Sequence, residues 1–494
     1  MSNQLDNKCR YIGQFGYTIF KNNVSPKIIK KIYKDLVVQP IMIGVPSHIK
    51  PLKFKIFQES PRKLYIPKYY GIKEFGVPEN IKSIGGIPID ITFKGSLRPK
   101  QLPIVNSYLK NIGKPEGFGG IISVPCGWGK TVMSIYIISQ IKLKTIIFVH
   151  KEFLMEQFKN EIEHFIPNAK IGKIQGKTID IENKDIVLAM IQSVAMKNYP
   201  PDLFKDFGLS IYDECHHIGA GVFCKCPSKA PTKYTLGLSA TPNRKDGLRR
   251  VFEWYLGDMV YEINERDDNN VDVDMVYYKN DDPDYRNIIE TAQGKPNRPR
   301  MISQIADFGP RRDVVCKLLK ECYDEERQTL ILSDRKSLLT FIYEWCKHRQ
   351  MDVGYYIGGM KQEDLDKSAK KRVIVSTYAM SSEGMNIKSL NTLILATPKS
   401  DIVQSVGRIL RLKPEERTIT PKVIDIIDPH DIFDTAFIQR RRFYKKNDYS
   451  VKIYDWEHGE KIFKGDGKKK QNKKKCKSNN QDMNLLPKGK CLID

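Results

Sequence analysis

Short apolar runs recur along the chain, separated by stretches in which apolar residues follow helical spacing. In the first half these runs lie at 119–125, 144–150, 185–191, 209–214 and 234–240. A second series lies at 328–334, 352–359, 371–378, 391–398 and 421–428. Strands that alternate with helices predict a parallel sheet with helices on both faces. The fold class is therefore α/β, with two doubly wound parallel-sheet domains in tandem.

The same pattern divides the chain. An N-terminal accessory domain of β or α+β type is expected at 1–85, because its apolar and polar residues alternate over short stretches. The two sheets are expected at 86–265 and 311–460, and the acidic, irregular stretch 266–310 reads as a linker between them. The tail at 461–494 is rich in lysine and poor in apolar residues, which predicts disorder.

The net charge of the chain predicts a class of binding partner. The formal charge is +24 and the pI is about 9.4, which favours a polyanion and most simply nucleic acid, although a basic surface can also be indifferent. Residues 1–85 could contact nucleic acid or be a solvated surface. The tail could be a nuclear-import signal, a nucleic-acid arm or a solubilising segment.

Cysteines and hydropathy bear on the compartment. The ten cysteines show no paired framework, which suits a reducing, intracellular compartment. Cys224 and Cys226 form a lone CxC pair, weak as a zinc site, and we assign them to a loop. The N-terminus has no apolar signal core, and no stretch approaches 18 apolar residues, so neither secretion nor a membrane span is predicted.

A glycine-rich turn after the first apolar run carries the strongest candidate chemistry. The backbone N–H groups of Gly127, Trp128 and Gly129 would form an anion-binding nest at the start of a helix. Lys130 would reach the β- and γ-phosphates of ATP, and the Thr131 hydroxyl would bind Mg²⁺. The motif normally has glycine where Val124 stands, so a surface loop that merely contains GxGKT is the alternative.

A pair of carboxylates follows a neighbouring apolar strand. Asp213 stands where a metal-holding carboxylate belongs, and Glu214 is placed to accept a proton from the attacking water. His216 and His217 follow directly, but no further ligand stands at a zinc spacing. We read His216 as a residue that couples the ATP site to the nucleic-acid path.

Taken in order, these segments resemble the motifs of superfamily 2 helicases. The resemblance implies RecA-like domains and makes Gln101, in LRPKQ, the residue that reads adenine. It assigns coupling to LSAT, residues Ser239, Ala240 and Thr241. Hydroxyl and amide groups at strand ends bind phosphates without reading bases. The nucleic-acid contacts implied in the first half are Lys151, Gln157, Gln192 and Ser193.

The resemblance continues in the second half. Ser376 and Thr377 end a strand and would contact nucleic acid, and Gly384 and Asn386 would couple, although related proteins usually have aspartate at Asn386. In DIVQSVGRILR three polar residues lie at i, i+4 and i+7 and so share one helix face. Arg408 and Arg411 are candidate arginine fingers, and Gln404 would position water or phosphate.

Within superfamily 2 the motifs are most similar to the XPB-type group, which includes transcript-release DNA helicases of large cytoplasmic DNA viruses of poxvirus type. KLYIPKYYGIKEFG, at 63–76, also resembles the N-terminal part of those viral proteins. This implies a nucleic-acid-stimulated ATPase with ATP and Mg²⁺ as cofactors. It implies a DNA track with 3′ to 5′ polarity, in host cytoplasm or virion, with RNA polymerase or transcription factors as candidate partners.

Four alternatives remain open at this point. RNA helicases carry the same motifs, so the track could be RNA. The protein could also be a translocase that moves along double-stranded nucleic acid without unwinding it. A scaffold that binds ATP without hydrolysis is disfavoured by Lys130, Asp213, Glu214 and Arg408. A restriction-enzyme subunit would need a nuclease domain, for which little chain is left.

Overall fold

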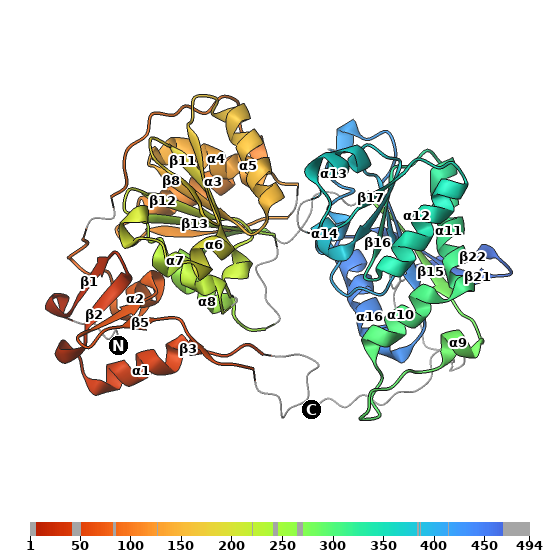
Figure 1. Ribbon diagram of the computed structural model, residues 1–494, viewed down its shortest axis with the longest axis horizontal. Coiled ribbons are helices and arrows are strands. Elements are labelled where there is room, and N and C mark those ends of the chain that lie inside the picture. Colours follow the sequence, from red (N-terminus) through yellow and green to blue (C-terminus); the bar gives the residue numbers. More distant parts are fainter. Residues whose placement is uncertain are drawn as a thin grey trace, which may run out of the picture.

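A computed structural model describes residues 6–41, 51–82, 85–125, 127–219, 221–240, 246–263, 270–382, 385, 387–412 and 414–467. Two α/β bodies lie side by side, and a smaller N-terminal body packs on the first of them (Figure 1). Disorder was expected from 461 onward, but 461–466 belong to the strand β22 (Glu460–Asp466), and the Lys-rich remainder from 468 lies outside the described residues. Within them, no helix is both long and apolar enough to cross a membrane.

The first sheet has eight strands in the order β10-β9-β11-β8-β12-β13-β7-β14, all parallel except β10. The five predicted strands are its centre: β11 (Ile186–Met190), β8 (Thr145–Val149), β12 (Leu209–Tyr212), β13 (Tyr234–Ser239) and β7 (Gly119–Ser123). The three strands toward the two edges were not predicted: β10 (Thr178–Asp180), its neighbour β9 (Ile171–Gln175), and β14 (Met259–Glu262). Edge strands mix polar and apolar residues, so they lack the continuous apolar run of a strand covered on both faces.

The second sheet has the order β17-β18-β16-β19-β20-β15-β21-β22, parallel except for β22. The predicted strands are again neighbours: β17 (Val353–Tyr356), β18 (Val373–Thr377), β16 (Thr329–Ser333), β19 (Thr392–Leu395) and β20 (Lys422–Ile427). Three strands were not predicted: β15 (Asp272–Tyr278), β21 (Ser450–Glu457) and β22 (Glu460–Asp466).

The stretch expected as a linker, 266–310, contains β15, which pairs with β20 on one side and β21 on the other. It also holds α9 (Pro283–Arg286), α10 (Arg298–Asp307) and the start of α11 (Gly309–Asp324). The aspartates of β15 interrupt its apolar pattern, so the sequence did not predict this strand. Asp274 is buried there because Lys461 Nζ, 3.1 Å from its carboxylate, neutralises it. These residues therefore belong to the second sheet and its helical layer.

Helices cover both faces of each sheet, as the alternation predicts. In the first domain α3 (Leu102–Ile112), α4 (Lys130–Ile141) and α5 (Glu152–Phe165) cover one face, and α6 (Ile191–Met196), α7 (Cys226–Lys229) and α8 (Arg249–Leu256) pack on the other. In the second domain α10, α11 and α12 (Lys336–His348) lie opposite α13 (Gln362–Ala369), α14 (Tyr378–Ser382) and α15 (Val403–Val406). The last helix, α16 (Asp431–Lys446), contributes to both apolar clusters.

The N-terminal body is of α+β type. Its antiparallel sheet has the order β1-β2-β6-β5, with β1 (Arg10–Gly13), β2 (Gly16–Phe20), β6 (Lys63–Ile66) and β5 (Gln58–Glu59), beside α1 (Pro26–Leu36), α2 (Lys68–Phe75) and the pair β3 (Val37–Val38) and β4 (Phe54–Lys55). One apolar cluster runs from Tyr17 and Ile19 to Tyr212 and Phe252 of the first domain. The N-terminal body therefore extends the layer that covers one face of the first sheet.

Candidate active site

The glycine-rich turn joins β7 to α4, which begins at Lys130. Gly127 and Gly129 have φ of +87° and +79°, and a Cβ on Gly129 would lie 2.5 Å from Gln101 Nε2. Both positions therefore need glycine. Val124, where the motif normally has glycine, has no such need. It is buried in the core and its N–H donates to the Ser239 carbonyl at 3.1 Å.

Contacts within the turn hold its shape. Lys130 Nζ donates to the Val124 carbonyl at 3.4 Å, so the ammonium lies inside the curve of the loop. The Trp128 N–H faces the Pro125 carbonyl at 3.4 Å, and the Trp128 ring is buried beneath Lys100, whose Nζ is 4.4 Å from the ring centre. In this conformation the Trp128 N–H closes the turn, so one of the three N–H groups predicted for an anion nest is engaged within the turn, and the nest stays a prediction.

Gln101 and Arg98 brace the turn from outside. Gln101 is buried, its Nε2 donates to the Trp128 carbonyl at 2.8 Å, and its Oε1 accepts the Arg98 N–H at 2.9 Å. Arg98 Nη2 lies 3.3 Å from the Gly127 carbonyl. The amide nitrogen of Gln101 can donate one more hydrogen bond and its amide oxygen can accept one more, so recognition of adenine by Gln101 stays a prediction. The motif LRPKQ was recognised from the sequence, but no role was assigned to its Arg98, a cation beside the glycine-rich turn.

The carboxylate pair sits at the end of β12, beside the turn. The Asp213 N–H donates to the Phe148 carbonyl at 3.1 Å, which fixes it against the neighbouring strand. Glu214 has φ of +46°, an unfavourable conformation for a residue with a Cβ. Such strain persists only where surrounding structure enforces it and concentrates at functional sites.

Burial and nearby charges separate the two carboxyl groups. Burial raises the pKa of Asp213, and the negative charge of Glu214 raises it further. Burial acts in the same direction on Glu214, but the Lys130 ammonium and the nearby His216 outweigh it and hold the pKa of Glu214 below its ordinary range. Glu214 is thus an ionised carboxylate at neutral pH, as a proton acceptor must be.

His216 connects this pair to the strand that follows. Its Nδ1 lies 3.4 Å from Glu214 Oε2 and 3.2 Å from the Ser239 hydroxyl, at the end of β13. Ala240 directly follows Ser239, and Thr241 lies outside the described residues. The His216 and His217 rings are 4.4 Å apart, and His217 is 4.2 Å from His150. The contact joins the ends of β12 and β13, and the coupling role of His216 and Ser239 stays a prediction.

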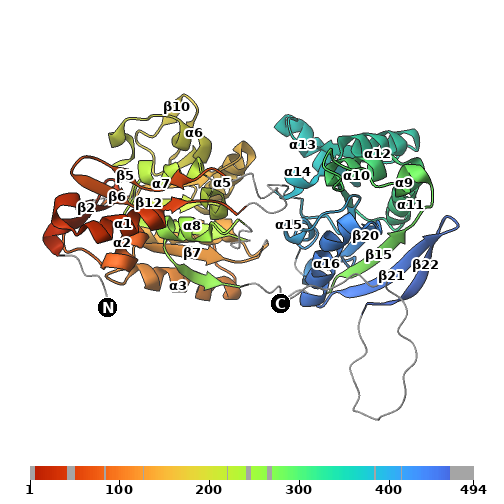
Figure 2. The ribbon, with the colours of Figure 1, turned by 90° about the horizontal axis from the view of Figure 1, so that it is seen from below.

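An open cleft of about 510 Å³ contains this site and reaches the second domain. Figure 2 shows α15 on the side of the second domain that faces the first. From the first domain the cleft is lined by Lys130, Thr131, Asp213, Glu214 and His216. From the second domain it is lined by Lys388, Gln404, Arg408, Arg411 and Glu416. The structure therefore brings the predicted catalytic residues of both halves to one place.

The local structure around the arginines differs from the single helix that was predicted. The helix α15 ends at Val406, and the N–H groups of Arg408 and Ile409 bond carbonyls three residues back. These are tight turns of 3₁₀ type, which still keep the three side chains on the cleft. Arg408 is buried, and its Nη1 donates to the Met385 carbonyl at 2.7 Å.

The residues assigned to nucleic acid in the first domain lie in two settings. Gln157 on α5 lines the cleft, and Lys151 is exposed just before that helix. Gln192 Nε2 donates to the His150 carbonyl at 2.7 Å, and the Ser193 hydroxyl accepts the Gly176 N–H at 2.9 Å. Gln192 and Ser193 therefore tie strand ends together, and their role toward nucleic acid stays a prediction.

In the second domain the predicted contacts differ more. Ser376 is fully buried and its hydroxyl donates to the Tyr356 carbonyl at 2.6 Å, so it does not reach the surface where a phosphate would lie. Thr377 Oγ1 lies 3.4 Å from the Met380 N–H at the start of α14. Polar residues at a strand end predicted exposure, but here they satisfy backbone groups. Gly384 and Asn386 lie outside the described residues.

The donor set suits a hard divalent cation. The Thr131 hydroxyl and the Asp213 carboxylate line the cleft with Glu214, whose Oε2 lies 3.4 Å from His216 Nδ1. Mg²⁺ prefers such oxygen ligands, few of them from protein, with the rest from phosphate and water. Among the described residues, the cleft included, no three His, Cys, Asp or Glu side chains cluster as a metal site by themselves. Cys224 and Cys226, assigned to a loop, are buried in two short helical turns, η6 (Phe223–Lys225) and α7.

Comparison with known proteins places this arrangement among helicases. Residues 94–244 match the family "Type III restriction enzyme, res subunit", and residues 310–413 match "Helicase conserved C-terminal domain". A protein of Acanthamoeba polyphaga mimivirus, named "Putative ATP-dependent RNA helicase", is 37% identical over 92% of this chain and 88% of its own length. A "Putative helicase" of Invertebrate iridescent virus 6 is 25% identical over 88% of this chain and 98% of its own.

Solved structures share the fold. A fragment of an HsdR subunit of a type I restriction enzyme from Vibrio vulnificus aligns with a TM-score of 0.53 and 17% identity, over 75% of this chain and 71% of that one. S. cerevisiae Dbp5 bound to RNA and ADP BeF3 aligns with a TM-score of 0.51 and 13% identity, over 73% and 94%. At these identities the likeness is one of fold, and it confirms the two tandem sheets.

Proposed function

The chain belongs to the superfamily 2 helicases, as an ATP-dependent hydrolase, and we propose that it moves along DNA and acts in viral transcription termination or transcript release. We propose RNA polymerase or transcription factors as partners. We place it in an intracellular, reducing compartment, either host cytoplasm or virion, with the nucleus reachable if the Lys-rich tail is an import signal.

One observation supports the motor above all. Lys130, Asp213 and Glu214 of the first sheet face Arg408 and Arg411 of the second across a single cleft. ATP bound at the turn would lie between the domains, so hydrolysis and reopening of the cleft are linked by geometry. A strand held by both domains would then be stepped once per cycle.

Each side chain has a distinct task at the phosphates. Lys130 and the turn bind the β- and γ-phosphates, and Glu214 accepts a proton from the attacking water. Thr131 and Asp213 would hold Mg²⁺, which when bound neutralises charge that develops on the phosphates. Arg408 and Arg411 approach the γ-phosphate from the second domain, and Gln404 orients water or phosphate.

The choice of DNA rests on the ordered motifs and on residues 63–76, which resemble the transcript-release group. A second candidate track is RNA, and the name of the mimivirus relative favours it. A double-strand translocase that does not unwind uses the same cleft. An RNA helicase would recognise the 2′-hydroxyl of its strand, which a DNA helicase does not need. The translocase differs in that it moves along a duplex without separating the strands.

Strand displacement separates them. Duplexes with a single-stranded tail would be prepared with DNA or RNA as the loading strand, each with 3′ and 5′ tails. We expect ATP-dependent displacement on the DNA strand with a 3′ tail and little on RNA. Displacement on RNA loading strands alone would overturn the DNA assignment. ATP turnover with movement on duplex DNA but no displacement would favour the translocase.

A further inference from the structure

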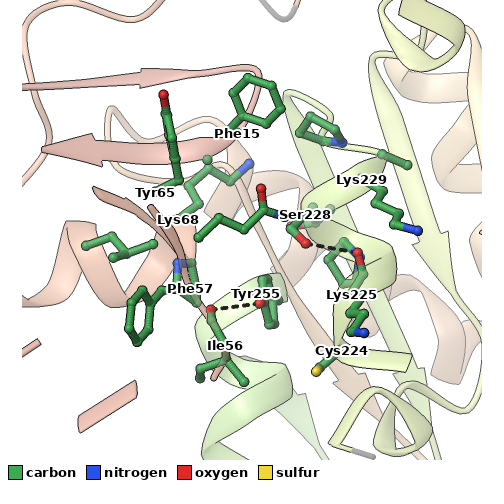
Figure 3. A pocket seen from close by; sticks show the side chains of 18 of the residues that line it. Phe15, Ile56, Phe57, Tyr65, Lys68, Cys224, Lys225, Ser228, Lys229 and Tyr255 are labelled. Atoms are coloured by element: carbon green, nitrogen blue, oxygen red, sulfur yellow. Dashed lines mark hydrogen bonds between the residues drawn. The ribbon is translucent and has the colours of Figure 1, made fainter. Parts of the chain in front are cut away.

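A second cavity, away from the ATP cleft, lies where the N-terminal body meets the first domain. Its volume is about 180 Å³, which has room for one planar ring system but not for a helix. Figure 3 shows Phe15 and Tyr65 of the N-terminal body on one side and Lys225 and Ser228 of the first domain on the other; Phe57 and Lys229 also line the cavity. Lys68, Tyr255 and Cys224 also line it.

Phe15 forms an aromatic corner of the cavity that the fold itself does not require. It stands in the two-residue turn between β1 and β2 and is 42% exposed, in a position where hairpins prefer asparagine and glycine. Its ring centre is 5.2 Å from that of Tyr65, with the planes tilted by 59°. Gly16 holds this turn against β6, because a Cβ there would lie 2.8 Å from the Ile66 carbonyl. An exposed, fixed ring of this kind can stack on a flat ligand.

The lining of the cavity is also basic. No aspartate or glutamate is among the described residues that line it, whereas Lys55, Lys68, Lys225 and Lys229 are. The charge of Lys55 is partly met by Glu59 at 3.8 Å. Lys229 Nζ donates to two backbone carbonyls, so Lys68 and Lys225 are the cations for a ligand. Lys68 is buried, and its Nζ donates to the carbonyls of Thr232 and Lys233 at 3.1 and 3.0 Å. Within the described part of the chain no carboxylate pairs with it, and burial lowers the pKa of Lys68 to about 7. A buried amine with this pKa holds its proton more firmly when an anion lies beside it, so the position favours an anionic ligand.

We propose that this cavity binds one unstacked nucleotide of a single nucleic-acid strand, with its base against Phe15 and Tyr65 and its phosphate toward Lys68 and Lys225. Aromatic rings accept any base by stacking, and lysines follow the phosphate, which is how sequence-tolerant strand binding works. The inference rests on the proposed function, since it gives the track of the motor a second point of attachment.

One residue that lines the cavity is the direct chain neighbour of an ATP-site residue. Tyr212 forms part of its lining and directly precedes Asp213. The Tyr212 ring stacks on Phe148 with centres 4.7 Å apart, and the Phe148 carbonyl accepts the Asp213 N–H. A nucleotide in the cavity and ATP in the cleft would therefore lie on opposite sides of the carboxyl end of β12.

Photocrosslinking and binding test this assignment together. The full chain, without ATP, is titrated with single-stranded DNA and RNA of about 12 nucleotides carrying 5-iodouracil, and crosslinked peptides are identified by mass spectrometry. We expect crosslinks to Phe15 or Tyr65, and binding about tenfold weaker for Phe15→Ala and Tyr65→Ala. Phe463→Ala is the matched control, because Phe463 is 54% exposed on β22 of the second domain.

Two results would overturn the assignment. One is the absence of crosslinks to the N-terminal body together with equal binding by Phe15→Ala and Phe463→Ala. The other is competition by a free mononucleotide at the affinity of the oligonucleotide, which would make the cavity a free-nucleotide site. If nucleic acid still stimulates ATP turnover in either case, the motor stands and only the cavity assignment fails.

Discussion

The two parallel sheets share a design but differ in the acids at the ends of their strands. In the first sheet Asp213 and Glu214 follow β12 with Lys130 and His216 nearby, and among the described residues no arginine pairs with either. In the second sheet β20 carries Asp425 and ends just before Asp428, and both are buried.

Arginines neutralise the acids of the second sheet. Arg440 Nε lies 2.8 Å from Asp425, and Arg311 makes two bonds to Asp428, at 2.5 and 2.7 Å. The Arg311–Asp428 pair is bidentate and therefore strong, whereas Asp425 accepts from Arg440 and from the Tyr444 hydroxyl on a single carboxylate oxygen. The comparison indicates that a buried acid paired with an arginine serves the fold, while the acids after β12 are available for chemistry.

The largest effect is expected on the first sheet. Lys130→Ala removes the cation that binds the β- and γ-phosphates, so ATP turnover should be lost while nucleic-acid binding stays near normal. Steady-state phosphate release and fluorescence anisotropy measure the two. Lys142→Ala is the control, because Lys142 is exposed at the other end of α4 and should keep full turnover. Turnover retained by Lys130→Ala would remove the phosphate-binding assignment.

Arg408→Ala should lower kcat by about 10³-fold with little change in ATP affinity, because the arginine acts on charge that develops during hydrolysis. Single-turnover kinetics and nucleotide binding separate the two quantities. Arg349→Ala, at an exposed arginine after α12, is the control. An unchanged kcat would make Arg408 a structural residue that holds the Met385 carbonyl.

Substituting acids in the two sheets tests the comparison itself. Asp428→Ala leaves Arg311 buried without its partner and should lower the free energy of unfolding by about 3–5 kcal/mol. Asp213→Asn should behave in the opposite way. Because the pKa of Asp213 is raised in the folded state, its charged form costs stability as pH rises through the folded pKa.

Urea unfolding at pH 8 without nucleotide or Mg²⁺ measures both variants. Asp213→Asn should be as stable as the parent chain or more so, yet inactive in ATP turnover. Equal destabilisation by the two substitutions would contradict the distinction between the sheets.

The contrast also explains which parts of the fold the sequence could predict. Ten strands, the centre of the first sheet and β17 to β20 in the order of the second, read as largely apolar runs, so all ten were predicted. β15 was missed because its acids are neutralised by residues far along the chain, as Lys461 neutralises Asp274. No local pattern records such a partner.

The site follows the same logic. Lys130, Asp213, Glu214 and Arg408 were identified because their motifs are local, and the structure places them on one cleft. Ser376 looked like a surface hydroxyl because its partner, the Tyr356 carbonyl, is on another strand. Arg98 was missed for a related reason, since its contact with Gly127 depends on how the turn folds.

The smallest effect concerns the tail. Deleting 468–494 removes a lysine-rich segment that follows β22, and it should weaken nucleic-acid binding and flatten its salt dependence if the tail is an arm. Affinity measured over a range of salt concentrations gives the slope. An unchanged slope would leave import or solubility as the role of the tail.

ATP turnover measured alone and with single-stranded DNA, duplex DNA and RNA, beside Lys130→Ala, tests the central claim most directly. The account predicts turnover that DNA stimulates strongly and RNA little, and that Lys130→Ala abolishes. The absence of turnover with every polymer would contradict it.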